Sequence, residues 1–283
     1  MKIRLILLIL LIPLFGCQLL APSSTLEPTA TAQISTLAPE PTAVTEPTAA
    51  ALPPTPAPTE TTAPPTETSK PDLVITTQAI VEASDTPKYE IDVQYPILEW
   101  GGDSRVDAFN EAAQTIASEE ARLFKEGTQV TIDDPYAKDM LSTLKMAYTT
   151  TYSEHGLVSV LFNVGYYMAG AAHPGYYAHT LTYDVNGGKQ LALDDIFQPG
   201  SNYLEPLSQY CIEELRKRDV LQWEDGALPK SENYRNWNLT PDGLMITFDE
   251  YQVASHAAGP QTVIVPYTEI QALLAPEFPL GTP

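Results

Sequence analysis

Basic residues are scarce in this chain, and cysteine and aromatic residues are absent from long stretches of it. Of 283 residues, 15 are lysine or arginine and 36 are acidic, so the formal net charge is −21. Proteins that bind nucleic acid through its phosphates need a basic surface. The excess of acids in this chain therefore argues against nucleic acid as a partner. The two cysteines, Cys17 and Cys211, cannot supply a disulfide framework or a cysteine-based zinc site. Phe15 is the only aromatic residue before Tyr89, so the first quarter of the chain cannot build an ordinary core.

The first residues have the pattern of an export signal. Lys2 and Arg4 precede an apolar run from Leu5 to Phe15, which is too short for a helix that crosses ~30 Å of hydrocarbon. The run ends in Leu14-Phe15-Gly16-Cys17, which resembles a bacterial lipobox, although Phe15 is less usual than a small or branched residue there. The resemblance implies a lipoprotein signal peptide over residues 1–17, a lipid on Cys17 and an extracytoplasmic protein anchored to the cell membrane. An ordinary signal peptide with an incidental cysteine is the alternative.

Residues 18–71 have the composition of a tether. They hold 12 prolines and 13 threonines, and short Glu-Pro-Thr repeats recur in them. Such a segment cannot bury enough apolar surface to offset the entropy lost on folding. Frequent proline favours an extended polyproline II chain, so we expect residues 18–71 to hold a folded unit away from a membrane.

The remaining residues, 72–283, are expected to fold. They carry 31 acids and 12 bases, a net charge of −19, which would attract cationic partners or serve solubility alone. Alternating or β-rich stretches predict strands, and two stripes at helical spacing predict helices from about residue 104 to 127 and over 203–218. The predicted strands are 89–95, 145–152, 157–167, 180–185, 237–239, 244–248 and 262–265, and a short helix over 267–274 closes the chain. Turn sequences separate most of the strands, so the predicted class is α+β with mainly antiparallel sheets and a few packed helices.

Several blocks in this region resemble a known family. Gly170-Ala-Ala-His-Pro174, Asp195-Ile-Phe197, Trp237 to Leu244 and Ala257-Ala-Gly259 resemble the C-terminal domain of RsiV-type proteins, which are extracytoplasmic anti-sigma factors that sense lysozyme. Residues from about Lys88 to Ala169 resemble the small domain that precedes the catalytic domain of PdaC-type peptidoglycan deacetylases. The resemblance implies two small subdomains, PdaC N-terminal-like over 72–169 and RsiV C-terminal-like over 170–283.

The same resemblance limits the function that can be expected. The sequence has no cytoplasmic sigma-binding segment and no motif of the deacetylase metal site, so neither activity carries over. What it implies is a non-catalytic binding or sensing module for a protein, such as a lysozyme-like one, or for a cell-wall glycan. An envelope polysaccharide hydrolase or deacetylase-type enzyme, and a passive envelope scaffold, remain alternatives. We expect no cofactor.

Candidate binding residues gather around the Ala-His-Pro block. Neighbouring residues of a strand face opposite sides of the sheet, so one member of each tyrosine pair should be partly exposed. The exposed rings either bind a protein or a sugar or belong to a tyrosine-rich sheet whose hydroxyls simply point to water. His173 lies in the block, and His256 could approach it only if the fold brings two distant blocks together. The histidines lack the spacing of a metal site, and we predict no metal ligand and no catalytic residue. The candidates are Tyr166, Tyr167, His173, Tyr176, Tyr177 and His256.

Acid pairs and Cys211 offer weaker chemistry. Asp133-Asp134, Asp194-Asp195 and Glu213-Glu214 could serve glycoside hydrolysis, but neighbouring acids in an acidic chain more often form a solvated surface. Cys211 lies on the apolar side of its predicted helix, which indicates a buried, unreactive thiol.

Overall fold

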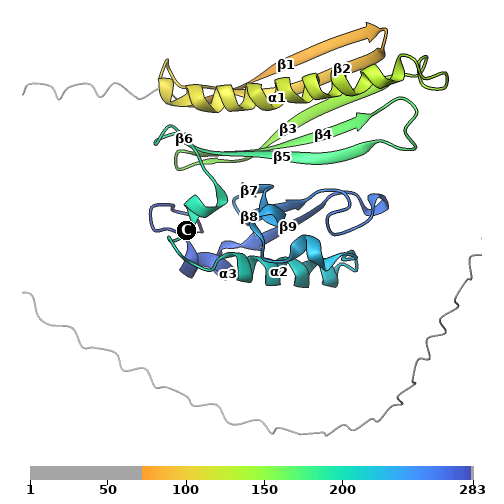
Figure 1. Cartoon of the computed structure of the whole chain (residues 1–283). Helices are drawn as coiled ribbons and strands as arrows, with labels where there is room; N and C mark the ends of the chain where they lie inside the picture. The colour runs from red at the N-terminus through yellow and green to blue at the C-terminus, as the bar shows by residue number, and fades with distance from the viewer. Residues whose placement is uncertain (1–71, 282–283) are drawn as a thin grey trace, which may run out of the picture. The chain divides into compact units, whose positions relative to one another are not determined.

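A computed structural model describes residues 72–281, and these form four stacked layers (Figure 1). A long helix covers one face of a six-stranded sheet, a three-stranded sheet packs on the other face, and two further helices cover the three-stranded sheet. The predicted signal peptide, the lipid site at Cys17 and the tether lie outside the described residues. Within residues 72–281, no helix is long and apolar enough to cross a bilayer.

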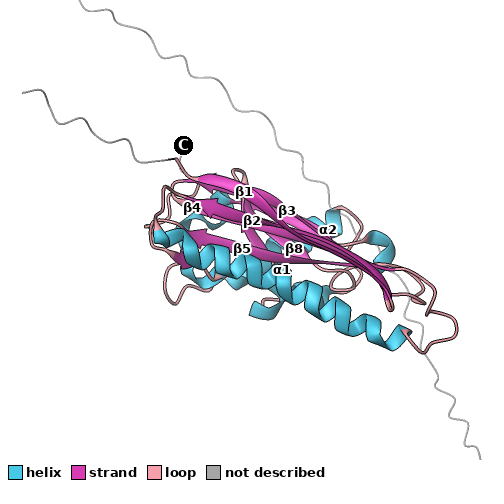
Figure 2. Ribbon diagram, turned by 90° about the horizontal axis from the view of Figure 1, so that it is seen from above, coloured by secondary structure: helices cyan, strands magenta, loops and turns pink. Residues whose placement is uncertain are grey.

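The six-stranded sheet follows the chain order. Its strands, neighbour to neighbour, are β1 (Val74–Asp85), β2 (Lys88–Glu99), β3 (Ser142–Glu154), β4 (Leu157–Tyr167), β5 (Gly175–Asp184) and β6 (Lys189–Gln190). All neighbours pair antiparallel except β2 and β3, which run parallel. Parallel neighbours need a crossover connection, and α1 (Asp107–Thr128) supplies it. Figure 2 shows α1 lying along the strands of this sheet.

The three-stranded sheet and its helices form the other half. The sheet has the order β7 (Trp237–Leu239), β8 (Gly243–Phe248) and β9 (Gln261–Pro266), all antiparallel. The helices are α2 (Leu204–Lys217) and α3 (Tyr267–Ile270).

Two apolar cores hold these layers together. One lies between α1 and the six-stranded sheet, where the rings of Phe109 and Tyr183 meet edge to face at 5.7 Å. The other lies between α2 and the three-stranded sheet and includes Cys211 and Phe248. The two sheets also share buried hydrogen bonds, because Ser159 Oγ of β4 accepts bonds from Asn238 Nδ2 at 2.9 Å and from the N–H of Leu239 at 3.1 Å, both in β7. Both cores are built from residues that the structure describes, so residues 72–281 carry their own folding energy.

The predicted α+β class is confirmed. The predicted strands and helices are all present, and the turn between β3 and β4 consists of His155 and Gly156, both with positive φ, as a tight hairpin requires. The prediction missed β1 and the parallel crossover through α1. It placed a subdomain boundary between residues 169 and 170, a point that falls between β4 and β5, two neighbouring strands of one sheet.

Candidate functional site

The outer edge of β5 is closed by carboxylates. Along most of its length β5 pairs with β4 on one side only, since β6 pairs with Tyr183 and Asp184 alone. The backbone N–H of Tyr176 donates to Glu250 Oε2 at 3.3 Å, and the N–H of Ala178 donates to Asp249 Oδ1 at 3.0 Å. Two acids of the other half of the molecule therefore take the place of the carbonyls of a further strand.

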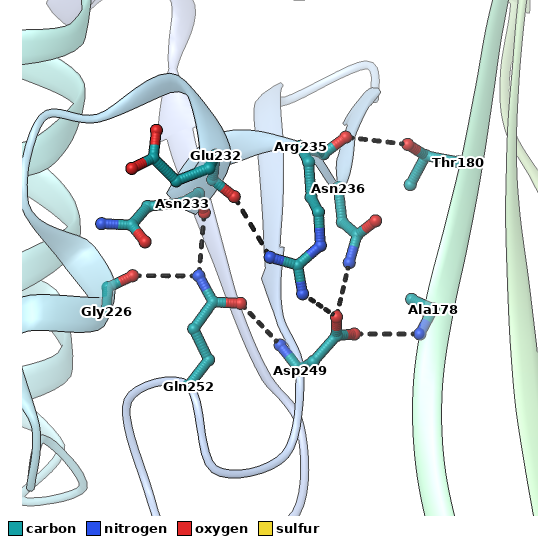
Figure 3. Close-up of polar contacts among 9 residues, drawn as sticks. All are labelled: Ala178, Thr180, Gly226, Glu232, Asn233, Arg235, Asn236, Asp249 and Gln252. Atoms are coloured by element: carbon teal, nitrogen blue, oxygen red, sulfur yellow. Dashed lines mark hydrogen bonds and ion pairs between the residues drawn. The ribbon is translucent and has the colours of Figure 1, made fainter.

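Asp249 is the centre of this contact (Figure 3). Its Oδ2 accepts hydrogen bonds from Arg235 at 2.5 Å and from Asn236 Nδ2 at 3.1 Å, while its backbone N–H donates to Gln252 Oε1 at 3.1 Å. Gln252 in turn donates from Nε2 to the carbonyl oxygens of Gly226 and Asn233, both at 2.9 Å. Hydrogen bonds thus join the turn after β8 both to the neighbouring loops around Gly226 and Asn233 and to β5 of the six-stranded sheet.

This turn presents Glu250 and Tyr251. Tyr251 has φ of +63°, in the left-handed region, and its ring is exposed. The side chain of Glu250 is 7% exposed, and its Oε2 lies 3.1 Å from Nδ1 of His256. The side chain of Asp249 and the bond from its N–H to Gln252 fix the backbone of the turn from which both side chains project.

His256 connects the two sequence blocks that carry the candidate residues. Its ring stacks on that of His173, with centroids 3.9 Å apart and planes 26° apart. The centroid of the Tyr251 ring lies 6.1 Å from that of His256, and the ring of Trp223 stacks on Tyr251 at 6.4 Å. His173 Nδ1 donates to the carbonyl oxygen of Pro174 at 2.8 Å, in line with a turn-ordering role for this histidine.

A hollow of about 550 Å³ lies beside these rings. Four of the candidate residues line it together with the turn from Asp249 to Tyr251, namely Tyr166, His173, Tyr176 and Tyr177. Tyr167 and His256 do not line it. Tyr166, Tyr176 and Tyr251 are all exposed large side chains, whereas Tyr177 is half-buried. The volume lies within the usual range of ligand sites, ~300–1,000 Å³. The tyrosines therefore offer accessible ring surface around a concave site.

Behind the hollow, Tyr177 belongs to a hydrogen-bonded group on the α1 side of the sheet. Tyr177 Oη donates to Glu120 Oε2, and His179 Nε2 donates to Glu120 Oε1 at 2.7 Å. Burial raises the pKa of Glu120, but the bonds from His179 and Tyr177 outweigh it and hold that pKa below its usual value. Burial and the bond to Glu120 raise the pKa of Tyr177. Tyr177 is thus held as a neutral donor to Glu120, and its ring forms a fixed part of the wall of the hollow.

Among the other sequence candidates, Cys211, Asp194 and Asp195 have structural roles. Cys211 is fully buried, and burial raises its thiol pKa to about 12. Asp194 accepts a hydrogen bond from Tyr203, and Asp195 accepts one from the backbone of Ala192 at 2.8 Å. No group of three or more histidine, cysteine, aspartate or glutamate side chains within residues 72–281 could hold a metal ion.

Sequence reasoning missed several residues of the site. Asp249, Glu250 and Tyr251 follow β8 directly, and Trp223 follows α2, far from the Ala-His-Pro block in the chain. A weak signal was present, since two adjacent acids and a tyrosine directly after an apolar strand are placed to cap a sheet edge. Which edge they meet depends on the tertiary fold.

Comparisons with known proteins agree with this architecture. The chain is 26% identical over 200 residues to the peptidoglycan-N-acetylmuramic acid deacetylase PdaC of Bacillus subtilis, an alignment that covers 69% of this chain and 41% of that protein. It is 27% identical over 143 residues to the immunogenic protein MPT64 of Mycobacterium tuberculosis, covering 50% of this chain and 61% of the relative. The chain therefore spans less than two thirds of either relative.

A solved structure shares the fold. A crystal structure of a DUF3298 family member from Bacteroides fragilis superposes with a TM-score of 0.51 at 18% identity, covering 73% of this chain and 95% of the other. Residues 194–268 match the family described as "Protein of unknown function (DUF3298)", a stretch that includes α2, the three-stranded sheet and the turn from Asp249 to Tyr251. The match to the DUF3298 family is thus confined to residues 194–268, and the described residues have an α+β fold like that of the solved member of that family.

Proposed function

We propose that this protein is a lipid-anchored binding module of the cell envelope and that its hollow holds a cell-wall glycan. The observation that carries the proposal is the set of exposed rings, Tyr166, Tyr176 and Tyr251, around a concave site of about 550 Å³. Flat amphipathic rings can cover the apolar face of a sugar while their hydroxyls remain in water. The backing carboxylates Asp249 and Glu250 are held by backbone donors, so the site is preorganised.

The relationship to PdaC supports the choice of ligand, because that protein is named for its action on peptidoglycan. The predicted signal peptide, Cys17 and tether would place the module outside the membrane at the end of an extended chain. Such an arrangement suits a protein that meets cell-wall polymer at some distance from its anchor.

A cationic protein is the second candidate ligand, and the net charge of −19 on residues 72–283 favours it. A field of this sign speeds the encounter with a basic protein at low ionic strength, and exposed tyrosines are common anchors of protein interfaces. The resemblance to RsiV-type sensors makes a lysozyme-like protein the natural probe.

Hydrolysis or deacetylation is less favoured by the geometry. His173 and His256 do meet, and Glu250 lies beside His256. However, Glu250 is almost fully buried and already accepts the N–H of Tyr176, which leaves it poorly placed to act on a substrate in the hollow.

Calorimetric titration of the fragment Asp72–Pro283 tests the proposal. The probes are the tetramer of N-acetylglucosamine and, separately, hen lysozyme at low and physiological salt, with co-sedimentation on purified peptidoglycan as a second assay. We expect saturable glycan binding that Tyr176→Ala and Tyr251→Ala each weaken about tenfold, which corresponds to 1.4 kcal/mol. Tyr136→Ala is the matched control, since Tyr136 is 88% exposed and does not line the hollow.

Three outcomes separate the candidates. Glycan binding that is lost with the hollow variants supports the proposal. Lysozyme binding that survives physiological salt and depends on the same tyrosines supports the second candidate instead. Binding of neither probe, or binding that Tyr136→Ala weakens equally, refutes a ligand site at the hollow.

A further inference from the structure

The two edges of the six-stranded sheet differ. At β5, carboxylates and the other half of the molecule close the edge, as described above. At the opposite edge, β1 pairs with β2 along all 12 of its residues and with no other strand that the structure describes. Figure 1 shows β1 as the outer strand of the sheet, on the side away from the three-stranded sheet.

The open edge lacks the usual protection against pairing. Natural edge strands are commonly blunted by lysine, proline, a bulge or a covering element. The sequence of β1, VITTQAIVEASD, contains no lysine, arginine or proline, and its register with β2 is continuous. Val81 is 76% exposed. The hydroxyl of Tyr148 contacts the first half of β1, at 2.6 Å from Thr77 Oγ1 and 3.5 Å from the carbonyl oxygen of Thr76. The second half, around Val81, pairs with β2 alone, and a regular edge of this kind can accept a further strand.

The face beside this edge carries exposed acids, and Lys88 of β2 and Lys145 of β3 share it with them. Ile91 and Val93 are buried toward α1, so their neighbours Glu90 and Asp92 lie on the opposite face of β2 and are exposed. On the same face of β1, Ala83 pairs with Glu90 and Val81 pairs with Asp92. The short side chains of β1 leave room for a long side chain to cross it toward these carboxylates.

These carboxylates are also free. Neither Glu90 nor Asp92, nor Asp85 at the end of β1, forms an ion pair or side-chain hydrogen bond within residues 72–281. By contrast, Glu82 on the α1 face is taken by Lys125 at 2.9 Å and by Tyr89 at 2.5 Å. At this edge the unpaired carboxylates therefore lie on the face that α1 does not cover, where they outnumber the two lysines, Lys88 and Lys145.

We infer that the free edge of β1 is a docking site for an extended, basic segment of another protein, which adds to the sheet as a seventh strand. Main-chain hydrogen bonds to β1 would hold the segment, and its lysine or arginine side chains would cross Val81 and Ala83 to reach Asp92 and Glu90. The net charge of the domain favours a basic segment over a second copy of the chain as the occupant of this edge. Two β1 edges would bring two domains of net charge −19 together, whereas a basic segment lowers the charge. This surface is separate from the hollow, so the inference does not depend on the proposed function.

The test uses fragment Asp72–Pro283 and a fluorescent seven-residue probe, Lys-Thr-Lys-Val-Lys-Thr-Lys, with its ends blocked. Binding is followed by anisotropy, and hydrogen exchange of β1 amides is measured with and without the probe. We expect slowed exchange in β1 and about tenfold weaker binding for the double variant Glu90→Lys, Asp92→Lys. Val81→Lys, which adds an edge lysine, should weaken binding by a similar factor without loss of stability, since Val81 is exposed.

Controls separate edge docking from general attraction. Glu111→Lys changes the charge by the same amount as each single substitution of the double variant, but on the exposed face of α1. It should leave the affinity for the probe within about twofold of that of the unchanged fragment. A probe with proline at positions 3 and 4 should not bind, because one of two successive N–H groups of a strand must face β1 and proline has none. Equal weakening by Glu111→Lys, or binding without slowed exchange in β1, overturns the inference. Sedimentation that shows a dimer abolished by Val81→Lys would overturn it in favour of a second copy.

Discussion

Replacing Asp249 should separate the two halves of the molecule more readily than replacing any exposed acid. The side chain of Asp249 is 14% exposed and accepts hydrogen bonds from Ala178, Asn236 and Arg235 (Figure 3). Asp249→Ala would leave the buried Ala178 N–H and Asn236 amide unpaired, at ~1–3 kcal/mol each. The bond to Arg235, which is largely exposed, adds little. We expect a loss of about 3 kcal/mol in the free energy of unfolding.

Urea unfolding followed by tryptophan fluorescence measures this loss, because Trp237 is buried next to Asn236. Asp249→Asn keeps an oxygen for Ala178 but turns an amide toward Asn236, so it should cost about half as much. Glu111→Ala is the control and should stay within about 0.5 kcal/mol, since Glu111 is exposed on α1. If Asp249→Ala and Glu111→Ala have the same effect, the carboxylate does not hold the halves together.

Three further predictions concern buried groups and a turn. The pKa of the Glu120 carboxyl is held below its ordinary value of 4.5. The ionised carboxylate therefore stabilises the fold above pH 4.5, and this stabilisation is lost as the pH falls through the lowered pKa. Glu120→Gln should thus flatten the decline of the urea unfolding midpoint between about pH 6 and pH 3. Burial raises the pKa of Cys211 to about 12, so iodoacetamide at about pH 8 should modify it only in urea, and rapid modification of the native protein would contradict its burial. Gly156→Ala should lower the melting temperature more than Gly102→Ala. Both glycines have positive φ, but a Cβ at Gly156 would lie 1.9 Å from Nδ2 of Asn186, whereas one at Gly102 meets nothing within 4 Å. Equal decreases in melting temperature would show that the contact with Asn186 does not add to the cost of Gly156→Ala.

Local patterns predicted most of the elements because their side chains alternate or repeat against a core. The strand at Tyr89–Tyr95 is an example, with four buried residues separated by exposed ones. β1 was missed for the opposite reason. Both of its faces are largely exposed or half-buried, so no clear alternation marks it in the sequence. It is a strand because β2 provides a full set of backbone partners, which is a property of the pair.

The candidate site was predictable in part for a similar reason. Tyr166, Tyr176 and Tyr177 lie on neighbouring strands joined by a short connection, so local sequence places them together. His256 is 83 residues from His173 by numbering, and their stacking depends on how the three-stranded sheet packs against β5. Long-range packing of this kind leaves no mark on a single sequence.

The net charge of the domain divides into groups with different roles once the fold is known. Asp249 and Glu250 face inward and accept N–H groups of a sheet edge, so their charge stabilises the fold. Glu90 and Asp92 face outward beside an open edge and have no partner in residues 72–281, so their charge remains available to a ligand. Composition alone counts these four acids equally. Neutralising the first pair should therefore lower stability with little effect on long-range attraction, whereas neutralising the second pair should weaken the binding of a basic probe and leave the unfolding free energy nearly unchanged.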